Sequence, residues 1–253
     1  MQVVVLGSGT AAPDPQRGAP SLLVVCDGDA VLLDCGSGCM QRLARAGVAP
    51  QELSAILITH AHLDHWGELA ALLFALRRPG GHRELPIQIH CSAQTAALFR
   101  RLDEALAPML QPPCGVELCE QLEQSFQIGA LRVSAKPVEH HASSIGFVLR
   151  APSGARLAYV GDCGSVDSAV ALCQDVDLAV LECSNSEEHE LPGHLGPQQI
   201  AEICQRARPG HALLCHIPPG RDEQQLLESV RHHGCSTPVS VAFDGLGLSL
   251  EDE

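Results

Sequence analysis

The stretch Thr59-His60-Ala61-His62-Leu63-Asp64-His65 follows an apolar run of buried-strand type and brings three imidazoles and a carboxylate close together. In an extended segment, residues two apart point to the same side, so His60 and His62 can bind one ion. The turn that follows then carries Asp64 and His65 towards a second ion. A solvated polar turn would not need this spacing after a buried strand. The stretch therefore predicts a metal site.

Length and composition limit the class of protein. The 253 residues, 45% of them hydrophobic, can bury a substantial core, and we expect a single domain over residues 1–253. No run approaches the roughly 20 apolar residues of a membrane helix, and the start of the chain lacks the basic residues of a secretory signal. We therefore expect a cytoplasmic protein with no membrane partner.

The charge and the cysteine and histidine contents indicate the partners, the redox state and the metal binding to expect. Lys+Arg 16 against Asp+Glu 30 gives a net charge of -14, which repels polyanions and disfavours a large nucleic-acid partner. The 12 cysteines are scattered without a Cys-x-x-Cys pair, which favours reduced, buried thiols over a disulfide framework. The 13 histidines exceed what packing requires and indicate metal ligation.

Apolar runs separated by Gly, Pro and Asp turns predict an α/β chain. We expect helices over 39–46, 69–76, 93–106, 197–207 and 222–232. We expect strands over 2–6, 21–26, 30–33, 55–59, 87–90, 131–138, 145–149, 156–160, 178–181, 212–215, 239–242 and 246–250. Strands at both ends with helices interleaved suit a sandwich in which helices cover two packed sheets.

Three segments together resemble one known family. The pattern His-x-His-x-Asp-His after a strand resembles the signature of the metallo-β-lactamase superfamily. Residues 32–38, Leu-Leu-Asp-Cys-Gly-Ser-Gly, resemble the Asp-Cys-Gly-x-Gly turn of its ribonuclease Z and phosphodiesterase branch. Gly7-Ser8-Gly9-Thr10 with Pro13, Arg17 and Ser21 resembles that branch's substrate-side loop. The resemblance implies an α/β fold, the αββα sandwich of two mixed sheets flanked by helices, and is weakest over 66–136.

The resemblance also implies the remaining metal ligands. His140 matches the family's third histidine, and its neighbour His141 would face away. Asp162, at the end of an apolar strand, matches the bridging carboxylate, and His216 matches the closing histidine. The implied site holds two divalent ions and a bridging hydroxide, with zinc favoured and manganese or iron as alternatives. The implied ligands are His60, His62 and His140 for one ion, Asp64, His65 and His216 for the other, and Asp162 between them.

Two residues are candidates for catalysis, namely the ligand Asp64 and His194. His194 resembles an extra histidine of the ribonuclease Z branch that lies near the metals and assists proton transfer. Leu195 and Gly196 replace the Ser or Thr usual there, and a polar loop residue is the alternative interpretation. The remaining histidines lack such a context, and we expect them to be exposed or structurally satisfied. They are His82, His90, His189, His211, His232 and His233.

The ligand set and the Asp-Cys-Gly turn favour phosphodiester hydrolysis, since two ions roughly 3.5 to 4 Å apart suit in-line displacement at phosphorus. Ribonuclease Z recognises tRNA with a long arm, and only a short hairpin over 147–157 occupies the corresponding span. The expected partner is therefore a small phosphodiester or cyclic nucleotide. The layout, including residues 242–245, is similar to short-chain cyclic phosphodiesterases of carbon-phosphorus lyase pathways.

Several alternatives stay open on the sequence alone. One is a ribonuclease Z-like endoribonuclease without the tRNA arm, and another is a hydrolase of carboxyl esters, thioesters or lactones. A homodimer is also left open. Glu68 stands where ribonuclease Z has a glycine, so the following helix could start differently and a carboxylate could lie near the pocket.

Overall fold

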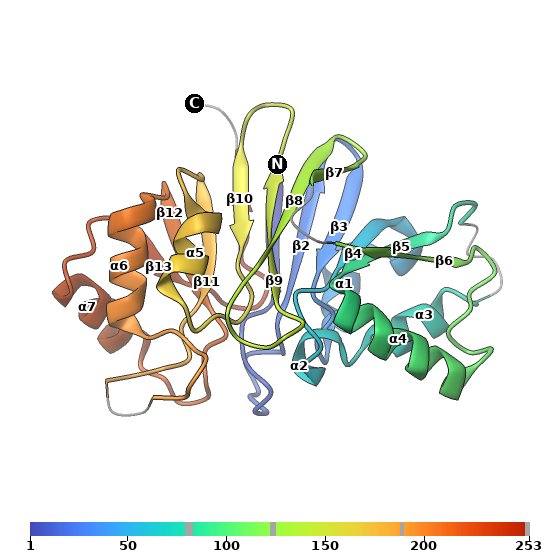
Figure 1. Ribbon diagram of the computed structural model, residues 1–253, viewed down its shortest axis with the longest axis horizontal. Helices are drawn as coiled ribbons and strands as arrows, with labels where there is room; N and C mark the ends of the chain where they lie inside the picture. The colour runs from blue at the N-terminus through green and yellow to red at the C-terminus, as the bar shows by residue number, and fades with distance from the viewer. Residues whose placement is uncertain (79–82, 122–124, 188–189, 251–253) are drawn as a thin grey trace.

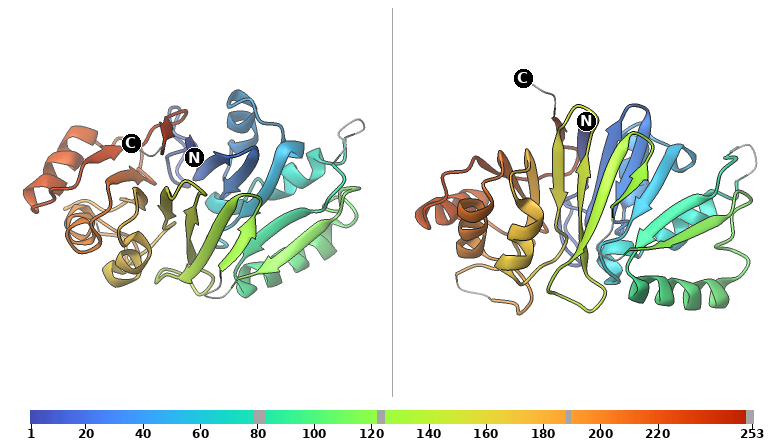
Figure 2. Two further views of the ribbon diagram at one scale, coloured as in Figure 1. Left: turned by 90° about the horizontal axis from the view of Figure 1, so that it is seen from above. Right: turned by 45° about the horizontal axis from the view of Figure 1, so that its top comes forward.

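Two seven-stranded mixed sheets pack face to face between two outer layers of helices in the computed structural model (Figure 1). The structure describes residues 1–78, 83–121, 125–187 and 190–250. Figure 2 shows the same four layers from two further directions. The expected αββα sandwich is the observed fold. Among the described residues, no helix is long and apolar enough to cross a membrane.

The first sheet has the strand order β14-β1-β2-β3-β4-β5-β6. Strands β14, β1, β2 and β3 pair antiparallel, and β3 to β6 pair parallel. The strands are β1 (Gln2–Gly7), β2 (Ser21–Cys26), β3 (Asp29–Leu33), β4 (Leu53–Leu57), β5 (Ile87–Cys91), β6 (Val116–Glu120) and β14 (Gly247–Ser249). Helices α1 (Cys39–Arg45), α3 (Leu69–Ala75) and α4 (Ala93–Leu106) lie on its side of the molecule (Figure 1).

The second sheet repeats this plan in the order β13-β12-β11-β10-β9-β8-β7. Strands β7 to β10 pair antiparallel, and β10 to β13 pair parallel. The strands are β7 (Ser125–Ile128), β8 (Leu131–Pro137), β9 (Ile145–Arg150), β10 (Arg156–Tyr159), β11 (Leu178–Glu182), β12 (His211–Cys215) and β13 (Val239–Val241). Helices α5 (Val166–Cys173), α6 (Pro197–Ala207) and α7 (Glu223–His232) cover its outer face (Figure 1).

An apolar layer between the sheets holds the two halves together. In β8, Leu131, Val133 and Ala135 are buried, while Arg132 and Lys136 are exposed, as period-two alternation requires of a strand with one buried face. The central cluster also contains the fully buried ring of Phe147 from β9. Two further apolar clusters lie under the outer helices.

The structure departs from the expected elements in a few places. Strands β6 and β7, helix α5 and the 3-10 turn Pro50–Glu52 were not expected. Asp64 and His65 lie on a single helical turn, α2 (Leu63–Trp66), where an irregular turn was expected. β6 and β7 are short and only partly buried, so their residues lack the apolar periodicity from which a strand can be read.

Candidate metal centre

The predicted ligands lie in the segments that follow the ends of strands in both sheets, with Asp64 and His65 on the helical turn α2. His60 follows β4, Asp162 follows β10 and His216 follows β12. These three strands belong to the parallel parts of the two sheets. In open α/β sheets, ligands bind beyond the carboxyl ends of the strands. The seven predicted ligands therefore converge although 156 positions, from 60 to 216, separate the first from the last.

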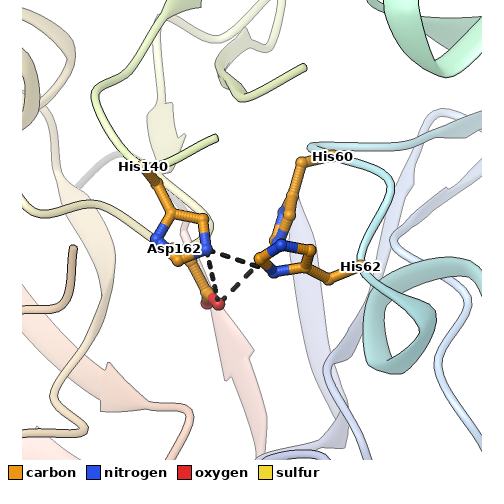
Figure 3. A group of neighbouring side chains, drawn as sticks. All are labelled: His60, His62, His140 and Asp162. Atoms are coloured by element: carbon orange, nitrogen blue, oxygen red, sulfur yellow. Dashed lines mark hydrogen bonds and ion pairs between the residues drawn. The ribbon is translucent and has the colours of Figure 1, made fainter. Parts of the chain in front are cut away.

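One group of ligands consists of His60, His62, His140 and Asp162 (Figure 3). Their nearest ligand atoms all lie within 4.8 Å of one another. His62 Nδ1 is 3.2 Å from His140 Nε2. Asp162 Oδ2 is 3.6 Å from His140 Nε2 and 3.8 Å from His60 Nε2. Three ring nitrogens and a carboxylate oxygen therefore face a common point, as a four-coordinate ion requires.

A second group consists of Asp64, His65 and His216. Asp64 Oδ2 is 3.3 Å from His216 Nε2 and 3.8 Å from His65 Nε2. Asp162 Oδ1 lies 3.3 Å from His65 Nε2 and 3.5 Å from His216 Nε2. Asp162 thus directs Oδ2 towards the first group and Oδ1 towards the second, which is the arrangement of a bridging carboxylate.

Orphaned polar atoms show that this centre fits divalent ions. Within the described part of the chain, His60 Nε2, His65 Nε2 and Asp162 Oδ1 are buried without a hydrogen-bond partner. Buried polar atoms are nearly always satisfied, and an ion would satisfy all three. Burial lowers the pKa of His60 far below its usual value, so its imidazole is neutral, the form that binds metal. Mixed imidazole and carboxylate donors suit zinc, manganese or iron.

Asp34 is hydrogen-bonded to His65 of the second group, at the ring nitrogen that faces away from the other ligands. Its Oδ2 accepts a hydrogen bond of 2.7 Å from His65 Nδ1 and one of 2.9 Å from the Tyr159 hydroxyl. Its Oδ1 accepts from Thr59 N at 2.8 Å. Thr59 Oγ1 also lies 3.1 Å from His60 Nδ1. One buried carboxylate therefore contacts His65 directly and His60 through a hydroxyl.

Charge around His65 opposes the effect of its burial. Burial alone would lower the pKa of His65, but the charges of Asp162 and Asp34 raise it well above its usual value. The pKa of Tyr159 is also raised well above its usual value, by burial and then by the charge of Asp34. Tyr159 therefore remains a hydroxyl donor to Asp34.

Glu182 is the buried carboxylate that supports His194 directly and His216 through Ser184. Its Oε1 lies 2.8 Å from His194 Nδ1, and its Oε2 accepts from Ser184 Oγ at 2.7 Å. Ser184 Oγ is in turn 2.7 Å from His216 Nδ1. Glu182 was not predicted from the sequence, although it ends the apolar strand β11 as Asp162 follows the apolar strand β10.

The structure places His194 beside the predicted ligands. Its ring stacks on that of His216 with centroids 5.7 Å apart, and its Nδ1 is 4.0 Å from Asp162 Oδ2. Burial alone would lower the pKa of His194, but the hydrogen bond to Glu182 and the nearby carboxylate charges raise it above the usual value. Since Nδ1 donates to Glu182, Nε2 is the ring nitrogen left for chemistry.

The histidines outside the predicted ligand set have other partners. His141 is exposed and its Nδ1 is hydrogen-bonded to Ser143 Oγ, but its ring lies 5.2 Å from that of His62 instead of facing away from the ligands. His90 is buried against the ring of Phe126, and His211 is bonded to Ser240. His232 and His233 lie at the end of α7. His82 and His189 lie outside the described residues.

Glu68, which stands where ribonuclease Z has a glycine, makes a hydrogen bond to the start of a neighbouring helix. Its Oε2 accepts a hydrogen bond of 2.9 Å from Met40 N, in the first turn of α1. The carboxylate thereby satisfies a backbone donor that a helix start leaves without an intrahelical partner. Glu68 therefore contributes to the start of α1.

Comparison with known proteins identifies the family. The model of the β-lactamase superfamily domain matches residues 29–217, which include all seven predicted ligands. The chain belongs to the metallo-β-lactamase superfamily. Within this superfamily it is 32% identical over 243 residues to a ribonuclease Z of Mycobacterium sp. (strain KMS), covering 87% of this chain and 85% of that protein. It therefore lies in the branch of ribonuclease Z and related phosphodiesterases and is a metal-dependent hydrolase.

Solved structures confirm the fold. The metallo-β-lactamase fold protein YhfI from Bacillus subtilis superimposes with a TM-score of 0.85 at 20% identity, covering 98% of both chains. A diphosphatase from the PhnP family superimposes with a TM-score of 0.78 at 21% identity, covering 99% of this chain and 98% of the other. At these identities the likeness concerns the fold alone.

Proposed function

We propose that this metallo-β-lactamase-fold hydrolase is a two-ion phosphodiesterase for small phosphodiesters, including cyclic nucleotides. The observation that carries the proposal is the position of Asp162, which offers one oxygen to each of two ligand groups. When bound, a pair of ions lowers the pKa of a water and clamps the attacking and leaving oxygens of an in-line displacement. We expect zinc in both positions.

The chain's own residues provide the proton transfers. Asp64, at the rim of the second group, is only partly buried and can accept the proton of an attacking water. His194 is held by Glu182 through Nδ1, which leaves Nε2 to deliver a proton to the leaving oxygen. The two residues therefore divide the roles of base and acid.

Two features favour a small substrate. Strands β9 and β10 are joined by the short turn 151–155 where ribonuclease Z is expected to carry its arm. The net charge of -14 opposes binding of a polyanion such as tRNA.

A second candidate is a ribonuclease Z-type endoribonuclease. The Mycobacterium relative named ribonuclease Z favours it, because the alignment extends over most of both chains. Both candidates hydrolyse a phosphodiester and would use the same residues. The two candidates differ in the size of the substrate, a small diester in one case and a precursor tRNA in the other.

The test is a substrate panel on metal-quantified protein. It comprises bis-p-nitrophenyl phosphate, 2′,3′- and 3′,5′-cyclic nucleotides, a precursor tRNA with a 3′ trailer, a carboxyl ester, a thioester and a lactone. His65→Ala and Asp162→Asn serve as site variants, and His211→Gln, remote from the ligands, as the matched histidine control. We expect about two ions per chain and cleavage of small diesters that both site variants lose.

Each other outcome assigns a different activity. Faster cleavage of precursor tRNA than of any small diester would establish the ribonuclease candidate. Turnover confined to the carboxyl ester, thioester or lactone would move the chain to the esterases. Diester cleavage that persists in Asp162→Asn would show that the bridging carboxylate is not needed and overturn the proposal.

A further inference from the structure

His141 lies beside the first ligand group without belonging to it. Its ring centroid is 5.2 Å from that of His62, and the two rings are tilted by 55°. His62 is itself a member of the first group, together with His140 (Figure 3). The side chain of His141 is exposed, and no described residue forms a hydrogen bond with its Nε2. A polar ring atom is therefore accessible next to the predicted ligands.

The turn over residues 141–144 holds this ring in place. The backbone N–H of His141 donates to Ser144 Oγ at 3.2 Å, and Ser144 N donates to the carbonyl oxygen of His141 at 2.9 Å. Ser143 and Ser144 are both buried. Ser143 Oγ also accepts the backbone N–H of Ala61 at 3.2 Å. The turn is thereby tied to the ligand-bearing segment after β4.

Hydrogen bonds at Nδ1 determine which ring nitrogen of His141 carries the proton. Ser143 N donates to Nδ1 at 3.2 Å, and Ser143 Oγ lies 2.8 Å from the same nitrogen. Because a backbone N–H can only donate, Nδ1 must be the accepting nitrogen. The ring proton then lies on Nε2. His141 is therefore a hydrogen-bond donor that is fixed at Nδ1 and open at Nε2.

We propose that His141 is a substrate-binding residue that donates its Nε2–H to a phosphoryl oxygen of the diester at the first ligand group. Phosphoryl oxygens are anionic acceptors, and a donor that is already held in place loses little entropy when it binds them. His194 packs against His140 and His216. His141 packs against His62, so the two histidines border different ligands. The inference rests on the proposed function, which names this substrate.

Two variants separate the donor from the rest of the ring. In His141→Gln the amide nitrogen can reach the position of Nε2 and keep a donor there, whereas the shorter side chain of His141→Asn ends near the position of Nδ1. Loss of one hydrogen bond to a charged group should lower kcat/KM for bis-p-nitrophenyl phosphate about 10- to 100-fold in His141→Asn. His141→Gln should recover most of that loss. His232→Asn, an exposed histidine at the end of α7, is the matched control and should retain the wild-type value.

Binding of inorganic phosphate to the zinc-loaded protein gives a second measurement, which needs no turnover. Calorimetry should show weaker binding in His141→Asn and binding close to that of wild type in His141→Gln. Both variants should contain as much zinc as wild type, because His141 is not among the predicted ligands.

Equal kcat/KM and equal phosphate affinity in wild type and His141→Asn would overturn the proposal. An equal loss in His141→Asn and His141→Gln would also overturn it, because the donor at Nε2 would then not be what matters. Loss of zinc in His141→Asn would assign the residue to the ion site instead. Wild type that binds phosphate and cleaves no diester would overturn the proposed function, and the phosphate affinities of the variants would then test this inference alone. Wild type that neither binds phosphate nor cleaves a diester would overturn both.

Discussion

Glu182 Oε1 lies 2.8 Å from His194 Nδ1, and each oxygen of this carboxylate also accepts a backbone N–H. Cys163 N donates to Oε1 and Ser184 N donates to Oε2. Glu182 is almost fully buried, so it cannot exchange these partners for water. The orientation of His194 is therefore set by the backbone through Glu182.

Replacing Glu182 by Gln should reduce diester turnover by roughly 10- to 100-fold, the usual effect of losing an outer hydrogen-bond partner at a metal site. Either orientation of the amide sets its NH₂ against a backbone N–H, so the contact with His194 or with Ser184 must change. Steady-state kinetics and metal content would measure this. Glu202→Gln, an exposed residue of α6 paired with Arg206, is the control. Equal kcat in both variants would contradict the role given to Glu182.

His90 should make stability depend on pH. Burial lowers its pKa to about 4 from 6.5. Its side chain is 4% exposed. Because the unfolded chain binds the proton first, stability is lost as pH falls from 6.5 towards 4, by about 1.4 kcal/mol per pH unit. We expect wild type to lose roughly 2 to 3 kcal/mol more than His90→Gln between pH 7 and 4.5.

Urea unfolding of metal-free protein at the two pH values would measure this difference. Omitting the ions removes the pH dependence of ion binding, and the other titratable groups, which both proteins share, cancel between them. Parallel losses of stability in wild type and His90→Gln would show that His90 is not the group responsible.

Asp244 should hold the loop over residues 8–18 in place. It accepts from Ser8 N and Ser8 Oγ through Oδ1, and from Gly18 N and Arg42 Nε through Oδ2. Asp244→Asn leaves at least one of these donors unpaired, at a cost of about 1 to 3 kcal/mol. Hydrogen exchange of residues 8–18 should accelerate, and it should remain at the wild-type rate in Phe243→Ala. An unchanged exchange rate in Asp244→Asn would assign the ordering of this loop to other contacts.

Phe147 should contribute more to stability than any exposed aromatic ring. Its side chain is fully buried between the sheets, whereas Phe243 is 55% exposed. Phe147→Ala should lower the free energy of unfolding by about 3 to 5 kcal/mol, through lost burial and a cavity. Phe243→Ala should change it by less than about 0.5 kcal/mol. Urea titrations with equal m-values would measure both, and similar losses in the two variants would contradict the assigned core.

The sequence could predict those parts of the fold and site that have a local signal. Helices α4 and α6 were predicted with their observed bounds; Ser92 caps the start of α4 and Pro197 begins α6. The motif after β4 predicted four of the seven candidate ligands, and the resemblance to the family implied His140, Asp162 and His216. Glu182 was not predicted, because its partners His194 and Ser184 reveal its role only once β11 and the 194 loop are folded together.

Asp34 also has partners that are distant in the sequence. The motif around it was recognised as a turn, but its bonds to His65 and Tyr159 join residues 31 and 125 positions away. Strands β6 and β7 escaped prediction for another reason. They are half-exposed edges whose pairing is set by β5 and β8, and pairing of this kind leaves little trace in the residues of one strand.

Ions bound at the two ligand groups would link the two sheets of the molecule. His60, Asp64 and His65 follow a strand of the first sheet, whereas His140, Asp162 and His216 follow strands of the second, so each ion would be held by residues from both sheets. At a free concentration 100 times its Kd, an ion adds about 2.7 kcal/mol to the stability of the folded state. Metal supply would then govern the lifetime of the protein as well as its chemistry.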